Sequence, residues 1–221
     1  MEKLSNISQE CMEEFIAAAQ RAARYGLVVC GSGNLSLKID SKRMLITTSG
    51  AWMEEMSDDQ ITVCNILDCA SLDGKKPSIE IGFHAGILRK REDVNVVLHF
   101  QSLYATALAC SNKQDLNFNV IPEIPYHVGP IVIVPYMNPG SDDLARSVIS
   151  AVNGHDLVVI QNHGQVTVGK DFRDALQKAM FFEFACGILL HAGDKIQTIP
   201  EKAISVLFDA RKNYSQPTQA V

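Results

Sequence analysis

The sequence predicts a three-layer α/β/α fold in which helices cover both faces of a central mixed, largely antiparallel sheet. Short apolar strand patterns and amphipathic helix patterns alternate along the whole chain. Some neighbouring strands are separated by turns of only a few residues, and such short connections favour antiparallel pairing. No linker or internal repeat interrupts the pattern, so we expect one domain over residues 1–221.

The first helix is expected to begin after Ser8, whose hydroxyl can cap free backbone N–H groups. Apolar residues then recur on one face until Gly26, which can end the helix. Two strands over 35–39 and 44–48 flank a polar turn and are expected to form a hairpin.

A capping-box pattern at Ser57 predicts a short helical turn before the next strand. Alternating strand and helix patterns follow, namely a strand over 61–67, a helix over 80–91, a buried strand over 94–101 and a short helix over 102–110.

The second half repeats the alternation. Ser141 can cap one helix, and Pro200 can open the last helix, which should end near Tyr214. The expected elements are a strand over 131–134, a helix over 141–153, strands over 157–161 and 165–168, a long apolar helix over 171–192 and a helix over 200–214.

Composition excludes several classes of protein. The formal net charge is −5 and the basic residues do not cluster, so a nucleic-acid partner is not expected. No apolar stretch is long enough to span a membrane, and the first residues lack the apolar core of a signal peptide. We therefore expect a cytoplasmic protein, whose six cysteines, without any CxxC pair, are small buried apolar residues.

A few histidines and polar residues near the ends of predicted strands suggest a metal site. Because strand side chains alternate between faces, His99 and Gln101 should point the same way from the end of one strand. His163 stands at a tight turn between two strands, and neutral imidazole is a common zinc ligand. Glu80 has no fixed sequence relation to these residues, and only the fold can bring it near them. The alternative is that both histidines are ordinary core or surface residues.

The other histidines have weaker cases for function. His84 stands four residues after Glu80 on the same helix face, where a structural hydrogen bond is expected. His127 lies in a predicted loop, so a binding role remains open. His155 and His191 are interpreted as a turn residue and a helix-end residue.

Glycine and hydroxyl residues in the first half suggest an anion site. Gly33 and Gly50 would let backbone N–H groups approach a ligand closely. Hydrogen bonds to phosphate oxygens could come from Asn34, Ser36, Thr48 and Ser49. The alternative is a pair of ordinary turns that bound a hairpin, and no nucleotide-binding motif is present.

In their order and spacing, these segments resemble the class II (zinc-dependent) sugar-phosphate aldolase family. The resemblance covers nearly the whole chain and includes Gly33–Ser36, Ile46–Gly50, Pro77–Glu80, His99 and Asn162–Gly164. It implies that substrate phosphate binds at Gly33, Asn34, Ser49, Gly50 and Ser78, and that a divalent metal, zinc first, binds at His99, Gln101 and His163. It also implies that Glu80 transfers a proton and that Tyr214 assists from a neighbouring subunit of a homotetramer.

Two positions depart from the family pattern. Ile79 stands where the family has a second serine, and its side chain cannot donate a hydrogen bond. Gln101 replaces the second histidine of a His-x-His segment. A neutral amide oxygen is a poorer zinc ligand than imidazole, so zinc should bind more weakly, or an ion that accepts oxygen ligands should be preferred. Water or His127 is a candidate to complete the metal shell.

The resemblance implies a metal-dependent aldolase that cleaves a ketose 1-phosphate, such as L-fuculose 1-phosphate, into dihydroxyacetone phosphate and an aldehyde. Related sugar-acid-phosphate decarboxylases and epimerases are alternatives, although the epimerases carry an aspartate where Glu80 stands. A catalytically silent binding or scaffold module on the same fold is a further alternative, which Ile79 and Gln101 favour.

Overall fold

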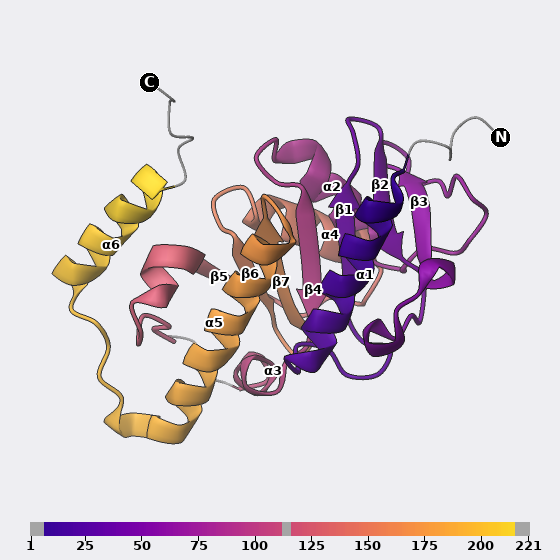
Figure 1. The fold of residues 1–221 in the computed structure, drawn as a ribbon. Coiled ribbons are helices and arrows are strands. Elements are labelled where there is room, and N and C mark those ends of the chain that lie inside the picture. The colour runs from indigo at the N-terminus through magenta and orange to yellow at the C-terminus, as the bar shows by residue number, and fades with distance from the viewer. Residues whose placement is uncertain (1–6, 112–115, 215–221) are drawn as a thin grey trace.

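A single seven-stranded sheet, in the order β3-β2-β1-β4-β7-β6-β5, runs through the computed structural model, which describes residues 7–111 and 116–214 (Figure 1). Each neighbouring pair is antiparallel except β5 and β6, which are parallel. The strands are β1 (Asn34–Lys38), β2 (Arg43–Thr47), β3 (Ile61–Asn65), β4 (Val96–Phe100), β5 (Ile131–Val134), β6 (Leu157–Ile160) and β7 (Gly164–Gly169). The prediction of a mixed, largely antiparallel sheet is therefore confirmed.

Helices cover both faces of this sheet, which confirms the predicted three layers. One apolar core joins the sheet to α1 (Gln9–Arg24), α3 (Leu103–Ala109) and α5 (Phe172–Ala192). A second core on the opposite face joins it to α2 (Ile81–Lys90) and α4 (Asp142–Ala151). Alternating side chains of the central strands, such as Val97 and Leu98, supply the two cores in turn.

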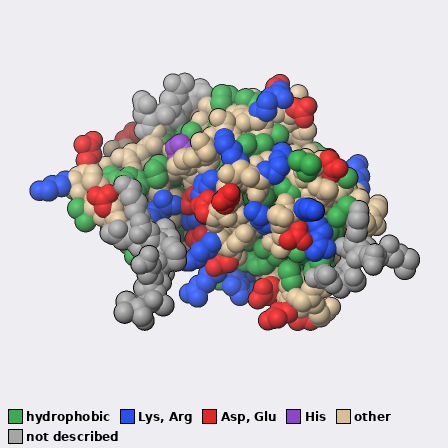
Figure 2. All heavy atoms as spheres, turned by 90° about the horizontal axis from the view of Figure 1, so that it is seen from above, with side chains coloured by type: hydrophobic (Ala, Val, Ile, Leu, Met, Phe, Trp, Pro, Cys, Tyr) green, Lys and Arg blue, Asp and Glu red, His purple; other side chains and the backbone are tan. Residues whose placement is uncertain are grey.

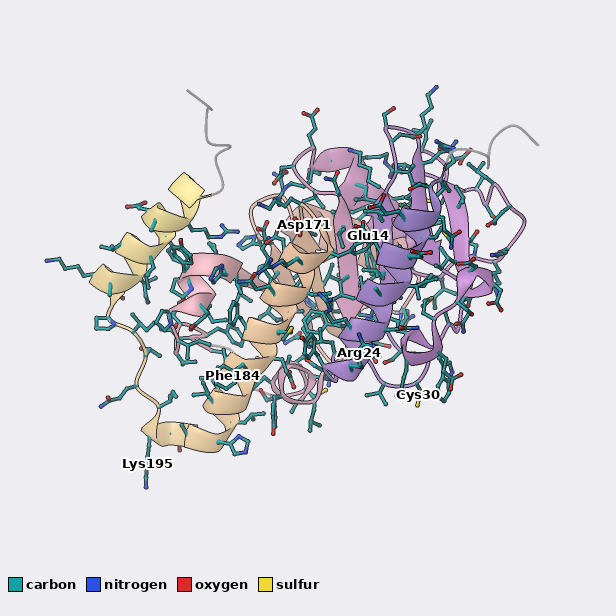
Figure 3. The ribbon with its side chains drawn as sticks, in the orientation of Figure 1. Glu14, Arg24, Cys30, Asp171, Phe184 and Lys195 are labelled. Atoms are coloured by element: carbon teal, nitrogen blue, oxygen red, sulfur yellow. The ribbon has the colours of Figure 1, made fainter. Side chains whose placement is uncertain are left out.

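The first helix forms as its sequence predicts. The Ser8 hydroxyl accepts a hydrogen bond from the Cys11 backbone N–H at 3.1 Å and caps the helix. Phe15 is fully buried on the apolar face and meets Phe172 edge-on, with ring centroids 5.8 Å apart. This contact joins α1 to the start of α5, where the Asp171 carboxylate caps the helix (Figure 3).

The last helix, α6 (Glu201–Tyr214), packs beside the short helical segment η3 (Ile124–Val128), away from the sheet (Figure 1). Arg211 of α6 forms an ion pair with Asp156, which also pairs with Lys178 of α5 and with Arg91 at the end of α2. Burial alone would raise the pKa of Asp156, but Lys178 and Arg211 outweigh burial and lower it. Asp156 therefore ties three helices together.

Several element boundaries differ from the sequence predictions. The strand predicted over 61–67 ends at Asn65, because the Asn65 side-chain oxygen accepts a hydrogen bond from the Leu67 N–H and turns the chain. A short 3-10 helix, η2 (Asp58–Gln60), forms where a helical turn was predicted, but the Ser57 hydroxyl bonds the Asp59 carboxylate rather than capping the backbone. The short helices η1 (Met53–Glu55), η3 and η4 (Gly193–Lys195) were not predicted.

The structure can be compared with what the composition predicted about charge, cysteines and membrane spans. Figure 2 shows acidic and basic side chains interspersed on one face of the molecule. Cys64 and Cys186 are buried, as predicted, whereas the prediction was wrong for Cys30 and Cys110, which are exposed. In the part of the chain that the structure describes, no helix is both long enough and apolar enough to cross a membrane.

Candidate metal and phosphate site

The predicted site residues meet at one edge of the sheet because of the strand directions. β1 and β7 begin at this edge, whereas the antiparallel strands β2 and β4 end there. The register pairs Asn34 of β1 with His99 of β4. Glu80 immediately precedes α2, and His163 lies in the turn between β6 and β7. Residues far apart in sequence therefore lie side by side.

These residues line a single cavity of about 280 Å³. The predicted metal and phosphate residues contribute to its wall, including Gln101, with the exception of Ser36. The prediction that Ser36 can bond phosphate is wrong, because its hydroxyl is fully buried and bonds His84 Nδ1 at 2.7 Å. The full lining consists of Gly31, Ser32, Gly33, Asn34, Thr48, Ser49, Gly50, Ser78, Ile79, Glu80, His99, Gln101, Pro139 and His163. The two halves predicted from the sequence are thus parts of one site.

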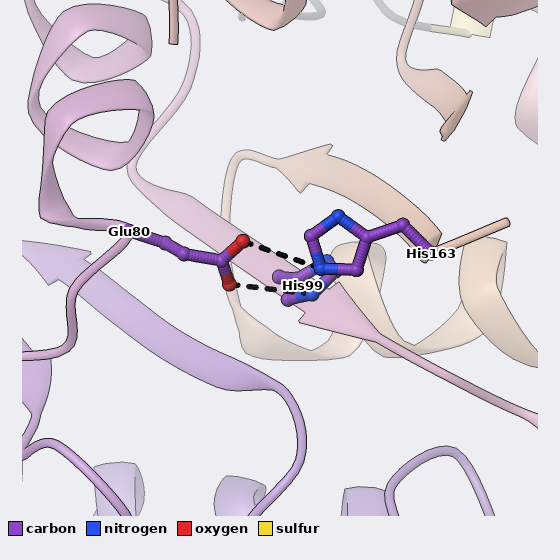
Figure 4. A group of neighbouring side chains, drawn as sticks. All are labelled: Glu80, His99 and His163. Atoms are coloured by element: carbon purple, nitrogen blue, oxygen red, sulfur yellow. Dashed lines mark ion pairs between the residues drawn. The ribbon is translucent and has the colours of Figure 1, made fainter. Parts of the chain in front are cut away.

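The centre of the site is the Glu80 carboxylate, whose two oxygens face two neighbouring imidazole rings, one oxygen to each ring (Figure 4). Its Oε2 is 3.3 Å from His99 Nε2, and its Oε1 is 3.4 Å from His163 Nε2. The side chains of Glu80, His99 and His163 are only 5%, 1% and 7% exposed. One ligand atom from each residue lies within 4.8 Å of the others.

The unpartnered atoms of this cluster suit a divalent metal. His99 Nε2 and Glu80 Oε1 are buried and have no hydrogen-bond partner among the described residues. The other ring nitrogen of His99 bonds the backbone oxygen of Gln165 at 2.9 Å, which orients Nε2 toward the cluster. Leaving such atoms unpaired is costly, and two imidazoles with a carboxylate match the ligand preferences of zinc and similar ions.

Two glycines allow the backbone to close around the site. Gly33 has φ +75°, and a Cβ there would lie 2.7 Å from the His99 carbonyl oxygen. At Gly164, a Cβ would lie 2.6 Å from the Phe100 carbonyl oxygen and 2.8 Å from Gln101 Cγ. Both distances are too short for a side chain, so β1 and the turn that carries His163 can approach the end of β4 only with glycine.

Backbone hydrogen bonds hold the phosphate half in place. Ser49 N–H donates to the Lys76 carbonyl oxygen, and Ser78 N–H donates to the Thr47 carbonyl oxygen, both at 3.0 Å. The Ser78 hydroxyl also accepts from the Glu80 N–H at 3.3 Å. These bonds set Ser49, Ser78 and the start of α2 side by side at the cavity wall.

A buried chain of hydrogen bonds supports Glu80 from behind. Asn34 Nδ2 donates to Glu80 Oε2 at 2.9 Å, and Asn34 Oδ1 contacts His84 Nε2. His84 Nδ1 in turn lies 2.7 Å from the Ser36 hydroxyl. The hydrogen bond expected for His84 is thus present, although it reaches Glu80 only through Asn34. Sequence reasoning missed this link, because nothing in the spacing pairs residues 34 and 36 with residue 84.

Burial favours the neutral form of two histidines in and behind the site. It lowers the pKa of His163, with a further decrease from His99 and an opposing effect from Glu80. Complete burial, followed by the proximity of His99, lowers the pKa of His84 well below its ordinary range. Neutral imidazole is the form that binds metals.

Two residues considered for the site from the sequence, His127 and Tyr214, have different outcomes. His127 stacks on Phe181 and lines a separate cavity with Asp156 and Arg211, so the suggestion that it completes the metal shell is wrong. Tyr214 is the last residue of α6, and its side chain lies outside the described part of the chain. Pro139, which lines the site, gave no recognisable signal in the sequence.

Comparison with known proteins finds two groups of named enzymes among the relatives of this chain. The chain is 33% identical to the 3-oxo-tetronate 4-phosphate decarboxylase of Haemophilus influenzae over 153 residues, which cover 68% of this chain and 72% of the relative. It is 32% identical to the L-fuculose phosphate aldolase of Methanocaldococcus jannaschii over 172 residues, covering 77% and 91% of the two chains.

Among solved structures, YgbL from Escherichia coli has the same fold. Its TM-score is 0.85 at 24% sequence identity, over 90% of this chain and 98% of that one. The family model for the class II aldolase and adducin N-terminal domain matches residues 13–190. On this match, and on the fold and cavity described above, the chain belongs to the class II aldolase and adducin N-terminal domain family.

Proposed function

We propose that this protein is a metal-dependent enzyme that decarboxylates a phosphorylated 3-keto sugar acid. The observation that carries the proposal is the buried Glu80 carboxylate facing two imidazoles, in the same cavity as the glycine and hydroxyl groups. Relatives named 3-oxo-tetronate 4-phosphate decarboxylases, 26–33% identical to this chain, favour decarboxylation over the aldol cleavage expected first. A silent scaffold would have no use for such a cluster.

The metal site would use the two imidazoles and an oxygen ligand. His99 and His163 would bind a divalent ion, zinc first, together with an oxygen from Gln101 or Glu80. When bound, such an ion polarises the substrate ketone and stabilises negative charge on its oxygen. The buried Gln165 carbonyl would hold the His99 ring in the orientation that this requires.

Glu80 would supply the proton that completes the reaction. Loss of carbon dioxide breaks the bond between the carboxyl carbon and the adjacent carbon, and the electron pair of that bond passes toward the ketone. A proton must then be added to the same carbon, and Glu80 would deliver it after its carboxylate has taken one up from solvent. The Glu80 carboxyl group lies in the cavity wall, and its Oε1 has no hydrogen-bond partner among the described residues, so it could act on a substrate carbon held there. With 3-oxo-tetronate 4-phosphate, the product would be dihydroxyacetone phosphate.

The substrate phosphate would bind at the opposite part of the cavity. The available donors are the hydroxyls of Thr48, Ser49 and Ser78 and the backbone N–H groups around Gly33 and Gly50. The cavity lining contains no Lys or Arg, so the donors from this part of the chain are neutral. Ile79 contributes backbone only, because its side chain is apolar and more than half exposed.

Aldol cleavage of a ketose 1-phosphate, such as L-fuculose 1-phosphate, is the second candidate. It is favoured by the archaeal relatives named L-fuculose phosphate aldolase, which are 31–33% identical to this chain. The same three-carbon fragment would form, and Glu80 would protonate the same carbon. The leaving group would be an aldehyde, and a tyrosine hydroxyl, with Tyr214 as the proposed donor, would handle its proton.

A product assay separates the two candidates. The purified, metal-loaded protein would be incubated with 3-oxo-tetronate 4-phosphate and, in parallel, with L-fuculose 1-phosphate. Carbon dioxide release from the first substrate supports the decarboxylase, whereas aldehyde release from the second supports the aldolase. If neither substrate is consumed by protein that retains stoichiometric metal, both candidates are excluded.

We also propose that the protein works in the cytoplasm as a homotetramer, with a neighbouring subunit contributing Tyr214 to each site. This part of the proposal rests on resemblance to the family. Light scattering and localisation of a tagged chain test the two parts separately.

A further inference from the structure

The hydrogen bonds behind Glu80 have a direction that follows from the chemistry of each group. A carboxylate oxygen only accepts, so Asn34 turns its Nδ2 donor toward Glu80 and its Oδ1 toward His84. An amide oxygen also only accepts, so His84 Nε2 must carry a proton. In a neutral ring, Nδ1 is then an acceptor, and it takes the hydrogen bond of the Ser36 hydroxyl at 2.7 Å.

Water cannot easily replace any member of this series of hydrogen bonds, because the residues that form it are buried. Ser36 and His84 are 0% exposed, and Asn34 and Glu80 are 6% and 5% exposed, so water has little access to these groups. Phe83 stacks on the His84 ring, with centroids 4.8 Å apart, and restricts its rotation. Burial also holds the pKa of His84 far below its usual value, so the neutral ring persists at physiological pH.

We propose that His84 is a positioning residue of the active site, which orients the Asn34 amide and through it the Glu80 carboxylate. Without the Nε2 donor, the Asn34 oxygen loses its buried partner and the amide is no longer held in one rotation. Its Nδ2 donor would then hold Glu80 less firmly, and the carboxylate would be less fixed in front of the two imidazoles. The inference rests on the proposed function, because Glu80 is assigned there as the proton donor.

The proposal also changes the expectation for Asn34. Both polar atoms of its amide are engaged by Glu80 and His84. The Asn34 side chain is therefore committed to holding Glu80, and any phosphate contact at this end of β1 comes from backbone N–H groups beside Gly33. His84 and Asn34 should consequently affect turnover more than substrate binding.

Nitrogen-15 NMR of the histidine rings in the native protein tests the direction of these hydrogen bonds and does not require turnover. We expect His84 as the neutral tautomer with the proton on Nε2. A proton on Nδ1, or a charged ring, at neutral pH would overturn the proposal. If the protein decarboxylates no substrate at all, the proposed function fails while this measurement still decides the hydrogen-bond direction.

Kinetics of three variants tests the consequence for turnover. His84→Leu removes the donor and should lower kcat by on the order of 10-fold or more, with KM changed by less than about 3-fold. His84→Gln keeps an N–H donor near the Nε2 position and should restore kcat to within about 3-fold of the native value. His155→Leu is the control and should leave kcat unchanged, because this histidine bonds the Ala151 carbonyl oxygen and is not among the described residues that line the cavity.

Native kcat in a folded His84→Leu protein would overturn the positioning role. Equal losses in the leucine and glutamine variants would also count against it, because the donor rather than the ring should matter. If the leucine variant does not fold, the glutamine variant and the tautomer measurement still decide the proposal.

Discussion

At the scale of single residues, Gln101 is the position where this chain departs most from its family pattern. It lines the cavity next to His99 and His163 but offers only a neutral amide. We predict that Gln101→His binds zinc more tightly by roughly 10-fold or more, the scale of change seen when metal-site residues are altered. A competition titration with a chelator measures this, with His155→Gln as a control that should not change affinity. Equal zinc affinity in the native and Gln101→His proteins would show that residue 101 does not contact the ion.

Gly164 is the second residue that decides the geometry of the site. A Cβ there would lie 2.6 Å from the Phe100 oxygen and 3.1 Å from His99 Cε1. We predict that Gly164→Ala lowers the free energy of unfolding by roughly 1–3 kcal/mol, as overpacking does, and weakens zinc binding. Chemical denaturation of the two proteins checks the first part.

Gly154→Ala is the matched control for that experiment. A Cβ at Gly154 meets nothing within 4 Å, so this variant should be neutral or slightly stabilising. If both alanine variants were equally stable, the close approach at Gly164 would not constrain the fold.

The sequence identified most of the residues that line the cavity but not how they contact one another. His99 and Gln101 were paired by strand alternation, and the glycine and hydroxyl segments were recognised by their composition. The contact of Asn34 with both Glu80 and His84 depends on the register of β1 against β4 and on the placement of α2. Such long-range placement has no local signal, which is also why His127 was wrongly considered for the metal shell.

At the scale of elements, Asp156 should contribute strongly to stability because it binds cations from three helices. We predict that Asp156→Asn lowers the free energy of unfolding at pH 7 by roughly 3 kcal/mol, as expected when a buried ion pair loses one partner. Asp143→Asn is the control, because its ion pair with Arg146 is largely exposed and should contribute less than about 1 kcal/mol. Equal effects of the two substitutions would contradict a central role for Asp156.

Asp156 should also make the free energy of unfolding depend on pH in a defined direction. The folded state lowers the pKa of Asp156, so its stabilising effect is fully present above the unfolded value of about 3.9. It is lost as the pH falls below that value toward the folded pKa. The stability difference between the native and Asp156→Asn proteins should therefore shrink below about pH 4, and denaturation at several pH values checks it.

Most elements were predictable because their signals are local. Ser8 and Ser141 cap α1 and α4 with the hydrogen bonds predicted from the sequence. The strands were found from apolar runs, although β3 ends early because Asn65 turns the chain. η3 was missed because its five residues include Pro125 and have no helical periodicity, and packing against α5 and α6 stabilises it instead.

At the scale of the whole molecule, assembly is the property that the sequence pattern constrains least. Resemblance to the family leads us to expect a homotetramer, whose mass in solution would be four times the 24.3 kDa of one chain. Light scattering at micromolar concentration measures this directly. A monomeric mass would remove the basis for a shared active site and for a role of Tyr214 from a neighbouring subunit.

The central claim is that the cluster of Glu80, His99 and His163 performs metal-dependent cleavage of a carbon–carbon bond. The most direct test compares the native protein with Glu80→Gln, both loaded with zinc, by carbon dioxide release from 3-oxo-tetronate 4-phosphate. We predict metal-dependent release by the native protein and a loss of about 100-fold or more in the variant, because the proton donor is gone while the two imidazoles still bind the ion. Equal turnover by a folded, zinc-loaded Glu80→Gln protein would contradict the account.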